Sequence, residues 1–317
     1  MVTYSVNFTG KKDMSAGKIQ PPFLRSGDEV AIISPAYTID EDKITDAVTI
    51  LEGWGLKVHL GKNALKHDGP FAGTENERIQ DIQAMTNSPD IKAVFCSRGG
   101  YGLLKIIDKI DFSALKRHPK WYIGYSDITI LLVWLSEREN LISVHAEMPL
   151  NYKNRETTPE TLGSLHAALF GYLKPVKWSG EFFRPGSAIG EVTGGNLSLI
   201  YSLTGTPGDP ETRRRILFIE DTDEYYYHLD RMLTSFNLTG KLRGLSALVS
   251  GGFTEMKDTK IPLGKSAEQI ISAVTAGYNY PVFTGFPAGH LNDNRAIYIG
   301  RRAKIEMYGD EAIFSYI

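Results

Sequence analysis

The sequence has almost no cysteine, since Cys96 is the one thiol among 317 residues. A single thiol excludes an internal disulfide framework and a zinc site of the CxxC kind. Nothing in the chain approaches 18 consecutive apolar residues, so the sequence predicts no membrane span. The first twenty residues also lack the apolar segment of a signal peptide, and we therefore expect a cytoplasmic protein.

An excess of charge of either sign is missing as well. The net charge is -2, and no cluster of Lys and Arg with interleaved aromatic residues is present. This balance argues against nucleic acid as a partner. Arg213–Arg215 precedes an apolar strand and is interpreted as a solvated edge. The chain is 42% apolar and 23% charged, which is typical of a globular protein, and it is long enough for two domains.

What the sequence does contain is two strand-loop-helix units in succession within residues 94–135. The first predicted strand, Ala93–Cys96, runs into the glycine-rich loop Ser97–Gly102. The second, Trp121–Gly124, runs into Tyr125–Asp127, and an apolar helix follows. In a parallel sheet both loops open on the same edge, outside the carboxyl ends of the strands, where ligands of α/β proteins bind.

Ser126 occupies the turn between the second strand and its helix. A serine at such a turn is pushed out of the sheet beside free backbone N–H groups, which is the arrangement of a nucleophile next to an oxyanion site. The alternative is that Ser126-Asp127 is an ordinary helix N-cap. The three glycines of Gly99–Gly102 suit close approach of the backbone to a ligand, or they form a plain tight turn. They match neither phosphate-binding motif.

The alternation of predicted elements indicates the fold. Strands Glu29–Ile33 and Leu56–Leu60 flank a helix over Asp40–Leu51, and Thr74–Glu77 has the pattern of a capping box. Such alternation requires parallel crossover connections. We predict a doubly wound α/β domain over residues 20–155, a connector over 156–188, and a β-rich domain over 189–317 with a few helices.

An activated serine needs a base, and the base needs an orienting group. His290 lies in the Gly/Pro loop Gly285–His290, where functional residues are often placed, and it is favoured over His145, which ends a strand near the expected catalytic edge. Glu220 follows the apolar strand Arg215–Ile219 and is the candidate orienting carboxylate. A rival dyad of Cys96 with a histidine is disfavoured because Cys96 falls within a buried strand pattern.

Six segments of the sequence resemble the LD-carboxypeptidases and occur in the same order as in that family. It is a serine peptidase family that also contains the microcin C self-immunity proteins. The resemblance covers the chain from about Pro22 to the C-terminus. The matching segments are Arg98–Gly102, Gly124–Thr129, Gly194–Ser198, Gly205–Pro207, Phe218–Asp221 and Gly289–His290.

The resemblance implies a catalytic triad of Ser126, Glu220 and His290, with an oxyanion hole formed by the N–H groups of Gly100 and Asp127. It implies an α/β domain and a β-rich domain with the site between them, no cofactor and no metal, and a homodimer. Members of the family remove D-alanine from an L-centre diamino acid in murein tetrapeptides during cell-wall recycling.

One departure concerns the substrate. Val144–Pro149 contains Glu147, where the family usually has His-Gly-Pro, so an extra carboxylate is expected near the cleft. Arg98 and Tyr101 are further candidates for substrate binding, although Arg98 is equally suited to bracing its loop. Two alternatives stay open. One is a hydrolase of peptidyl-nucleotide antibiotics with an aromatic from 171–183 stacked on the base. The other is an inactive two-lobed peptide-binding protein.

Overall fold

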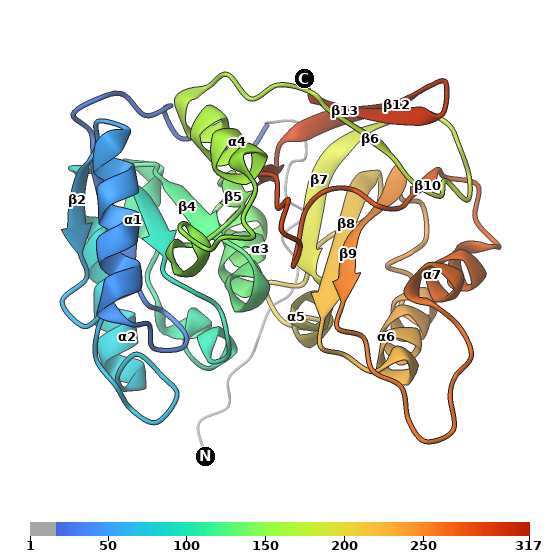
Figure 1. Ribbon diagram of the computed structural model, residues 1–317, viewed down its shortest axis with the longest axis horizontal. Coiled ribbons are helices and arrows are strands. Elements are labelled where there is room, and N and C mark those ends of the chain that lie inside the picture. The colour runs from blue at the N-terminus through green and yellow to red at the C-terminus, as the bar shows by residue number, and fades with distance from the viewer. Residues whose placement is uncertain (1–16) are drawn as a thin grey trace, which may run out of the picture.

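The structure is a computed structural model that describes residues 17–317. Most of the N-terminal segment examined for a signal peptide therefore lies outside the described residues. Two β-sheets stand side by side, each with helices against it (Figure 1). Within residues 17–317, no helix is both long and apolar enough to cross a membrane.

The first sheet has the order β11-β5-β4-β3-β1-β2. Its strands are β1 (Glu29–Ile33), β2 (Lys57–Leu60), β3 (Ile91–Cys96), β4 (Trp121–Gly124), β5 (Ser143–His145) and β11 (Ile297–Ile299). The first five are parallel, and β11 is antiparallel to β5. This agrees with the doubly wound α/β fold predicted from the alternation of elements.

Helices cover both faces of this sheet. They are α1 (Glu41–Gly53), α2 (Glu75–Asn87), α3 (Thr129–Arg138) and α4 (Pro159–Phe170). Buried residues of α2 and α3 belong to one apolar core, and those of α1 and α4 belong to the other. The predicted capping box is present, because Thr74 Oγ1 accepts from Glu77 N at 3.3 Å and Glu77 Oε2 accepts from Thr74 N at 2.9 Å. Short 3-10 helices span Leu103–Lys105, Ile107–Lys109, Ser113–Lys116, Ser126–Ile128 and Pro149–Asn151.

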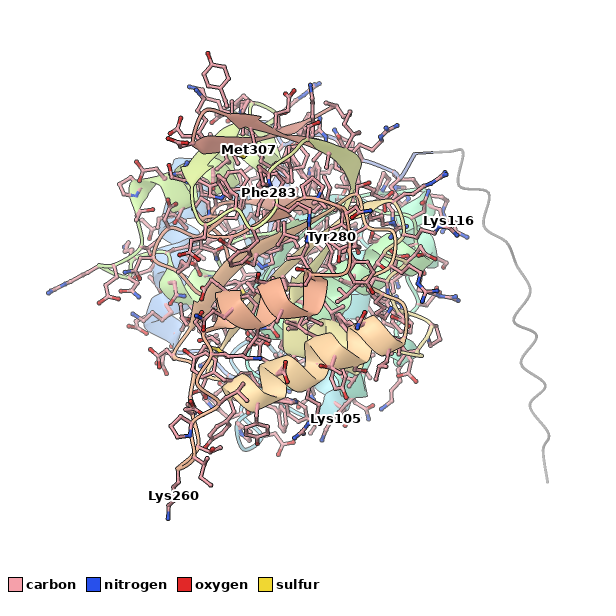
Figure 2. All side chains as sticks on the ribbon, turned by 90° about the vertical axis from the view of Figure 1, so that its right-hand side faces the viewer. Lys105, Lys116, Lys260, Tyr280, Phe283 and Met307 are labelled. Carbon is pink, nitrogen blue, oxygen red and sulfur yellow. The ribbon has the colours of Figure 1, made fainter. Side chains whose placement is uncertain are left out.

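The second sheet has the order β10-β9-β8-β7-β12-β13-β6. Its strands are β6 (Val176–Ser179), β7 (Ala188–Asn196), β8 (Arg215–Thr222), β9 (Ala247–Thr254), β10 (Val282–Phe283), β12 (Arg302–Tyr308) and β13 (Glu311–Tyr316). Its helices are α5 (Leu197–Ser202), α6 (Tyr226–Leu238) and α7 (Ala267–Thr275). Figure 2 shows α6 and α7 lying across the outer face of this sheet, and Lys260 projecting from the loop between β9 and α7.

One strand lies outside the predicted β-rich domain, and one strand within that domain pairs with the other sheet. β6 falls inside the predicted connector and pairs with β13. β11 follows the His290 loop and returns to the first sheet, where Ile297 is opposite His145. A strand of three residues has too little periodicity to indicate its partner, so only tertiary pairing reveals it. The pairing of β11 holds the end of the His290 loop against the carboxyl end of β5.

A buried cluster of charges ties the two halves together on the side of α3. Glu137 on α3 lies 3.3 Å from Lys18 and 2.5 Å from Arg215, which begins β8. Glu191 on β7 lies 3.1 Å from Lys18 and 3.2 Å from Arg215. Burial by itself raises the pKa of Glu137, but the two cations outweigh burial and lower it.

Glu137→Gln is expected to destabilise the protein by about 3 kcal/mol, because it removes one of two carboxylates and leaves two buried cations with Glu191 alone. Guanidinium unfolding at pH 7 measures the change. A lowered pKa means that the stabilisation is present above the unfolded pKa and is lost as the pH falls through the folded pKa. The gap between wild type and variant should therefore narrow in acid. The control is Glu306→Gln, whose pair with Lys304 is exposed and should contribute almost nothing. Equal effects of the two substitutions would contradict this account.

Candidate active site

Ser126 lies directly after β4 in a strained backbone conformation. Its φ is 60°, a left-handed value that a residue other than glycine rarely adopts. Neither Ser126 nor Asp127 caps the following helix with its side chain, so the N-cap interpretation is wrong. Strain of this kind costs about 1–3 kcal/mol and is typical of functional turns. The turn projects Ser126 from the carboxyl edge of the sheet, as a nucleophile turn requires.

The glycine-rich loop after β3 lies against this turn. A Cβ atom on Gly99 would come within 2.8 Å of Ser126 Cβ and 2.9 Å of Ser126 Oγ. Gly100 has a φ of 117°, and a side chain there would collide with the ring of Tyr37. In the described part of the chain, neither Gly100 N–H nor Asp127 N–H donates a hydrogen bond to another residue. Two unpaired N–H groups flanking a serine are what an oxyanion hole requires.

The Asp127 side chain fastens the two loops together. Its Oδ2 accepts from the backbone N–H of Leu103 at 3.0 Å, which fixes the far end of the glycine loop. The carboxyl is 1% exposed, and burial raises the pKa of Asp127 to about 6, against the opposing effects of the Leu103 N–H and Arg78. The sequence suggested for Asp127 a backbone role in an oxyanion hole or a place in a helix N-cap, so this tie was not predicted.

Glu220 and His290 meet at the same edge. His290 Nδ1 lies 2.7 Å from Glu220 Oε2, and Glu220 is fully buried whereas His290 is partly exposed. Burial alone would lower the pKa of His290, but the Glu220 carboxylate outweighs it and raises the pKa. Burial alone would raise the pKa of Glu220, but His290 and His145 outweigh it and lower the pKa. Gly289, with a φ of 101°, permits this approach, because a Cβ there would lie 2.7 Å from Glu220 Cβ.

The pair lies next to the serine turn. The ring of Tyr125, which immediately precedes Ser126, is centred 4.8 Å from the His290 ring. Ser126 Oγ forms no hydrogen bond with another residue in the part of the chain that the structure describes. Catalytic hydrogen bonds often tighten only when substrate is bound, so the absence of this hydrogen bond is compatible with a serine–histidine pair. Through Tyr125, the residue before Ser126, the serine turn therefore lies close to the Glu220–His290 pair.

A cavity of about 400 Å³ opens beside His290. Glu147 and Tyr125 line it, together with Asn151, Thr222 and Glu255. Glu147 is 2% exposed, and burial raises its pKa against the opposing hydrogen bonds of its neighbours. Its carboxylate accepts from Met148 N at 3.0 Å, Asn151 Nδ2 at 3.0 Å and Asn294 Nδ2 at 3.3 Å.

Asn294 was not predicted from the sequence. It is fully buried, and its Oδ1 accepts from Gly289 N at 2.9 Å while its Nδ2 donates to Glu147. It therefore fixes the backbone next to His290 and links that loop to the end of β5. Its position four residues after His290 was the one available signal, and amide residues in loops are too common for that signal to be specific.

Two segments of the family pattern, Gly194–Ser198 and Phe218–Asp221, make structural contacts with each other, and the first also contacts α3 of the other domain. Asn196 caps α5, and its backbone N–H donates to Thr129 Oγ1 at 3.1 Å. Asp221 accepts from Asn196 Nδ2 at 2.9 Å and from Ser198 Oγ at 2.8 Å. A Cβ on Gly195 would lie 2.8 Å from the Thr129 side chain. Glycine is thus needed here because the strand passes close to α3.

The remaining candidates make their contacts with other residues. Arg98 donates to Thr38 O at 3.1 Å and lies over the ring of Tyr37, a bracing position. Tyr101 is 47% exposed and packs near Phe71. Cys96 is fully buried within β3, and burial raises the pKa of its thiol, which disfavours the thiolate needed for the rival dyad. Among residues 17–317, no three His, Cys, Asp or Glu side chains gather as a metal site would require.

Gly99→Ala tests the approach of the two loops. The added methyl group must displace Ser126, and a misplacement of about 1 Å can cost about 100-fold in rate. We expect kcat to fall by about that factor while the unfolding midpoint changes little. Gly163→Ala is the matched control, because a Cβ there meets nothing within 4 Å. An unchanged kcat in Gly99→Ala would show that this contact does not limit the nucleophile.

Both halves of the chain match known protein domains. Residues 30–146 match the LD-carboxypeptidase N-terminal domain, and residues 189–305 match the LD-carboxypeptidase C-terminal domain. A probable murein peptide carboxypeptidase of Bacillus subtilis is 36% identical over 289 residues, covering 90% of this chain and 90% of that protein. The murein tetrapeptide carboxypeptidase of Pseudomonas aeruginosa is 31% identical, covering 87% and 92%.

Solved structures share the fold. The microcin C7 self-immunity protein MccF, known from Escherichia coli, superposes in its complex with aspartyl sulfamoyl adenosine with a TM-score of 0.85 over 94% of this chain and 98% of that chain. At 23% identity that likeness shows the fold alone. The two domain matches and the Bacillus relative show more: this chain belongs to the LD-carboxypeptidase family of peptidases.

Proposed function

We propose that the protein is a serine LD-carboxypeptidase that releases D-alanine from an L-centre diamino acid in murein tetrapeptide. The observation that carries the proposal is the strained Ser126 turn beside two unpaired N–H groups, at the same edge as the His290–Glu220 pair. The names of the curated relatives support murein peptide as the substrate class. Residues 17–317 supply every group that this chemistry needs, so the proposed mechanism uses no cofactor.

In the first half-reaction His290 removes the proton from Ser126 Oγ as the oxygen attacks the carbonyl carbon of the scissile amide. Glu220 holds His290 through Nδ1, so the other ring nitrogen is the base, and the carboxylate stabilises the imidazolium that forms. The N–H groups of Gly100 and Asp127 bind the developing oxyanion, and one such donor is worth about 3–4 kcal/mol. His290 then gives the proton to the leaving amine, and D-alanine departs.

The second half-reaction releases the diamino acid end of the peptide. Water enters where D-alanine left, His290 takes one of its protons, and the resulting hydroxide attacks the ester carbonyl of the acyl-enzyme. The tetrahedral intermediate collapses, and the proton returns to Ser126 Oγ. The cavity beside His290, with Glu147 and Glu255 in its lining, is proposed to hold the substrate next to the ester.

The peptidyl-nucleotide alternative called for an aromatic residue from 171–183 to stack on a nucleobase. Trp178 is 6% exposed, packs against Phe286 and donates to Thr284 O, so it belongs to the core of the second sheet. Residues 171–183 do not line the cavity beside His290. Nothing in this arrangement favours the nucleotide substrate. The alternative of an inactive peptide-binding protein gives no reason for strain at Ser126.

One assay tests the proposal. The protein is incubated in separate reactions with murein tetrapeptide, with the pentapeptide ending in D-alanyl-D-alanine, and with an aminoacyl sulfamoyl adenosine, and product release is followed by mass spectrometry. We expect D-alanine from the tetrapeptide only, because the oxyanion site fixes the stereochemistry on both sides of the bond. The tetrapeptide reaction should continue in EDTA. Hydrolysis of the nucleotide alone, or cleavage of both peptides at equal rates, would overturn the proposal.

The proposal includes the two further expectations of a homodimer and a cytoplasmic location, where murein fragments would be recycled. Analytical ultracentrifugation of the purified protein tests the first expectation. Fractionation of cells that carry the tagged full-length chain tests the second. A monomer at micromolar concentration would contradict the first expectation without affecting the assignment of the site.

A further inference from the structure

His145 is a buried titratable residue that the proposed mechanism does not use. It ends β5, its exposure is 0%, and its Nε2 lies 3.7 Å from Glu220 Oε1. The other oxygen of the same carboxylate, Oε2, is the one that holds His290. Glu220 therefore lies between two imidazoles, one on each oxygen.

The polar atoms at this contact have no other partners. Neither ring nitrogen of His145 and not Oε1 of Glu220 has a hydrogen-bond partner among the described residues. A buried carboxylate oxygen without a donor costs about 1–3 kcal/mol or more, so a buried imidazole facing it calls for an explanation. The distance of 3.7 Å is beyond a hydrogen bond but within range of a charge–dipole attraction.

The surroundings hold the His145 ring in place. The edge of Phe218 lies against it at 5.2 Å between centroids, and the Tyr125 ring lies at 5.8 Å. Its backbone pairs with Gly124 on one side and Ile297 on the other. The ionisable groups that face the Glu220–His290 pair are His145, Tyr125, Asp221 and Glu147. His145 is the one among them, besides His290 itself, that offers a nitrogen to the carboxylate.

We propose that His145 is a positioning residue that directs its Nε2–H at Glu220 Oε1 and thereby aims the carboxylate at His290. The inference rests on the proposed function for its kinetic consequence, but its electrostatic consequence is independent of turnover.

Loss of the His145 Nε2–H should change the pKa of His290 in one direction only. A carboxylate that loses a donor becomes more basic and attracts the His290 proton more strongly. The pKa of His290, already raised by Glu220, should rise further. His290 must be neutral to act as the base, so the acid limb of the kcat/KM profile should move to higher pH.

Two substitutions distinguish a role of His145 as a hydrogen donor from a role in packing alone. His145→Phe preserves the ring and removes the N–H, whereas His145→Gln places an amide N–H near the Nε2 position and removes the ring. The pKa of His290 is read by NMR titration of the histidine C–H signals, assigned with His290→Gln, and this readout needs no turnover. The kcat, KM and pH profile are measured in parallel with murein tetrapeptide.

We expect His145→Phe to raise the His290 pKa by about 1 unit and, on the acid limb of the profile, to lower kcat about tenfold at constant KM, since the neutral fraction of His290 there falls tenfold per pKa unit. His145→Gln should stay close to wild type in both. The reverse pattern would have the wild-type His290 pKa and kcat in His145→Phe and altered values in His145→Gln. It would show that His145 only fills the core. Equal shifts in both variants would also overturn the inference. If His145→Phe does not fold, His145→Met is the second variant without a donor. If the protein cleaves no tetrapeptide, the NMR titration still decides.

Discussion

Ser126→Ala is expected to reduce the rate of D-alanine release by about four orders of magnitude or more, because members of a triad act as a unit. Without the hydroxyl no acyl-enzyme forms, so the burst of product in rapid-quench experiments should also disappear. The residual rate would come from water attacking within the oxyanion site, which persists when the nucleophile is lost. Single-turnover kinetics with excess enzyme measures the rate, and rapid-quench kinetics with excess substrate measures the burst.

The backbone of Ser126 provides a second readout for the same position. Because φ is 60°, Ser126→Ala keeps the strain, whereas Ser126→Gly relieves it. We expect the glycine variant to be about 1 kcal/mol more stable than the alanine variant and equally inactive. A difference in stability without a difference in activity would separate the role of the Ser126 hydroxyl from that of the backbone turn.

Cys96→Ala is the control, since Cys96 is the rival nucleophile and is fully buried one strand away. It should change kcat by less than about twofold if its thiol takes no part in the reaction. Loss of activity in Cys96→Ala, with activity kept in Ser126→Ala, would overturn the assignment of the nucleophile.

Glu220→Gln is expected to lower kcat by about four orders of magnitude with little change in KM. A glutamine amide can donate to His290 Nδ1, which leaves the proton on the ring nitrogen that should act as the base. It also removes the negative charge that stabilises the imidazolium. The hydrogen bond that must change is the 2.7 Å contact between His290 Nδ1 and Glu220 Oε2.

The pH dependence of the same variant gives the sign of the electrostatic effect. Glu220 raises the pKa of His290, while burial lowers it, so removing the charge should lower the His290 pKa. The acid limb of kcat/KM should therefore move to lower pH, opposite to the direction expected for His145→Phe. Glu29→Gln is the matched control, because Glu29 also pairs with a histidine, His59, at 3.0 Å on an exposed edge of the sheet. A Glu220→Gln profile that moves to higher pH would contradict the role given to the carboxylate.

Local sequence was sufficient for most of the secondary structure. The strand Glu29–Ile33 is observed with the predicted bounds, and the capping box at Thr74 opens α2 as expected. These features depend on apolar periodicity and on hydrogen bonds between residues three apart, so they need no information from the rest of the chain. The same local signals indicated a strand-to-helix turn at Ser126, although they also allowed an N-cap that the structure does not contain.

The arrangement of the site was decided by contacts that no local pattern encodes. Both His145 and His290 lie against Glu220, and only the return of β11 to β5 explains why the His290 loop reaches that carboxylate from the other side. Asn294 fixes this loop through Glu147, a partner 147 residues away. Sequence periodicity specifies which face of a strand is buried, but the partner of a short edge strand and the orientation of an imidazole depend on the packing of the whole molecule. The sequence therefore determined which residue types were available for catalysis, and the tertiary structure determined which histidine contacts which oxygen.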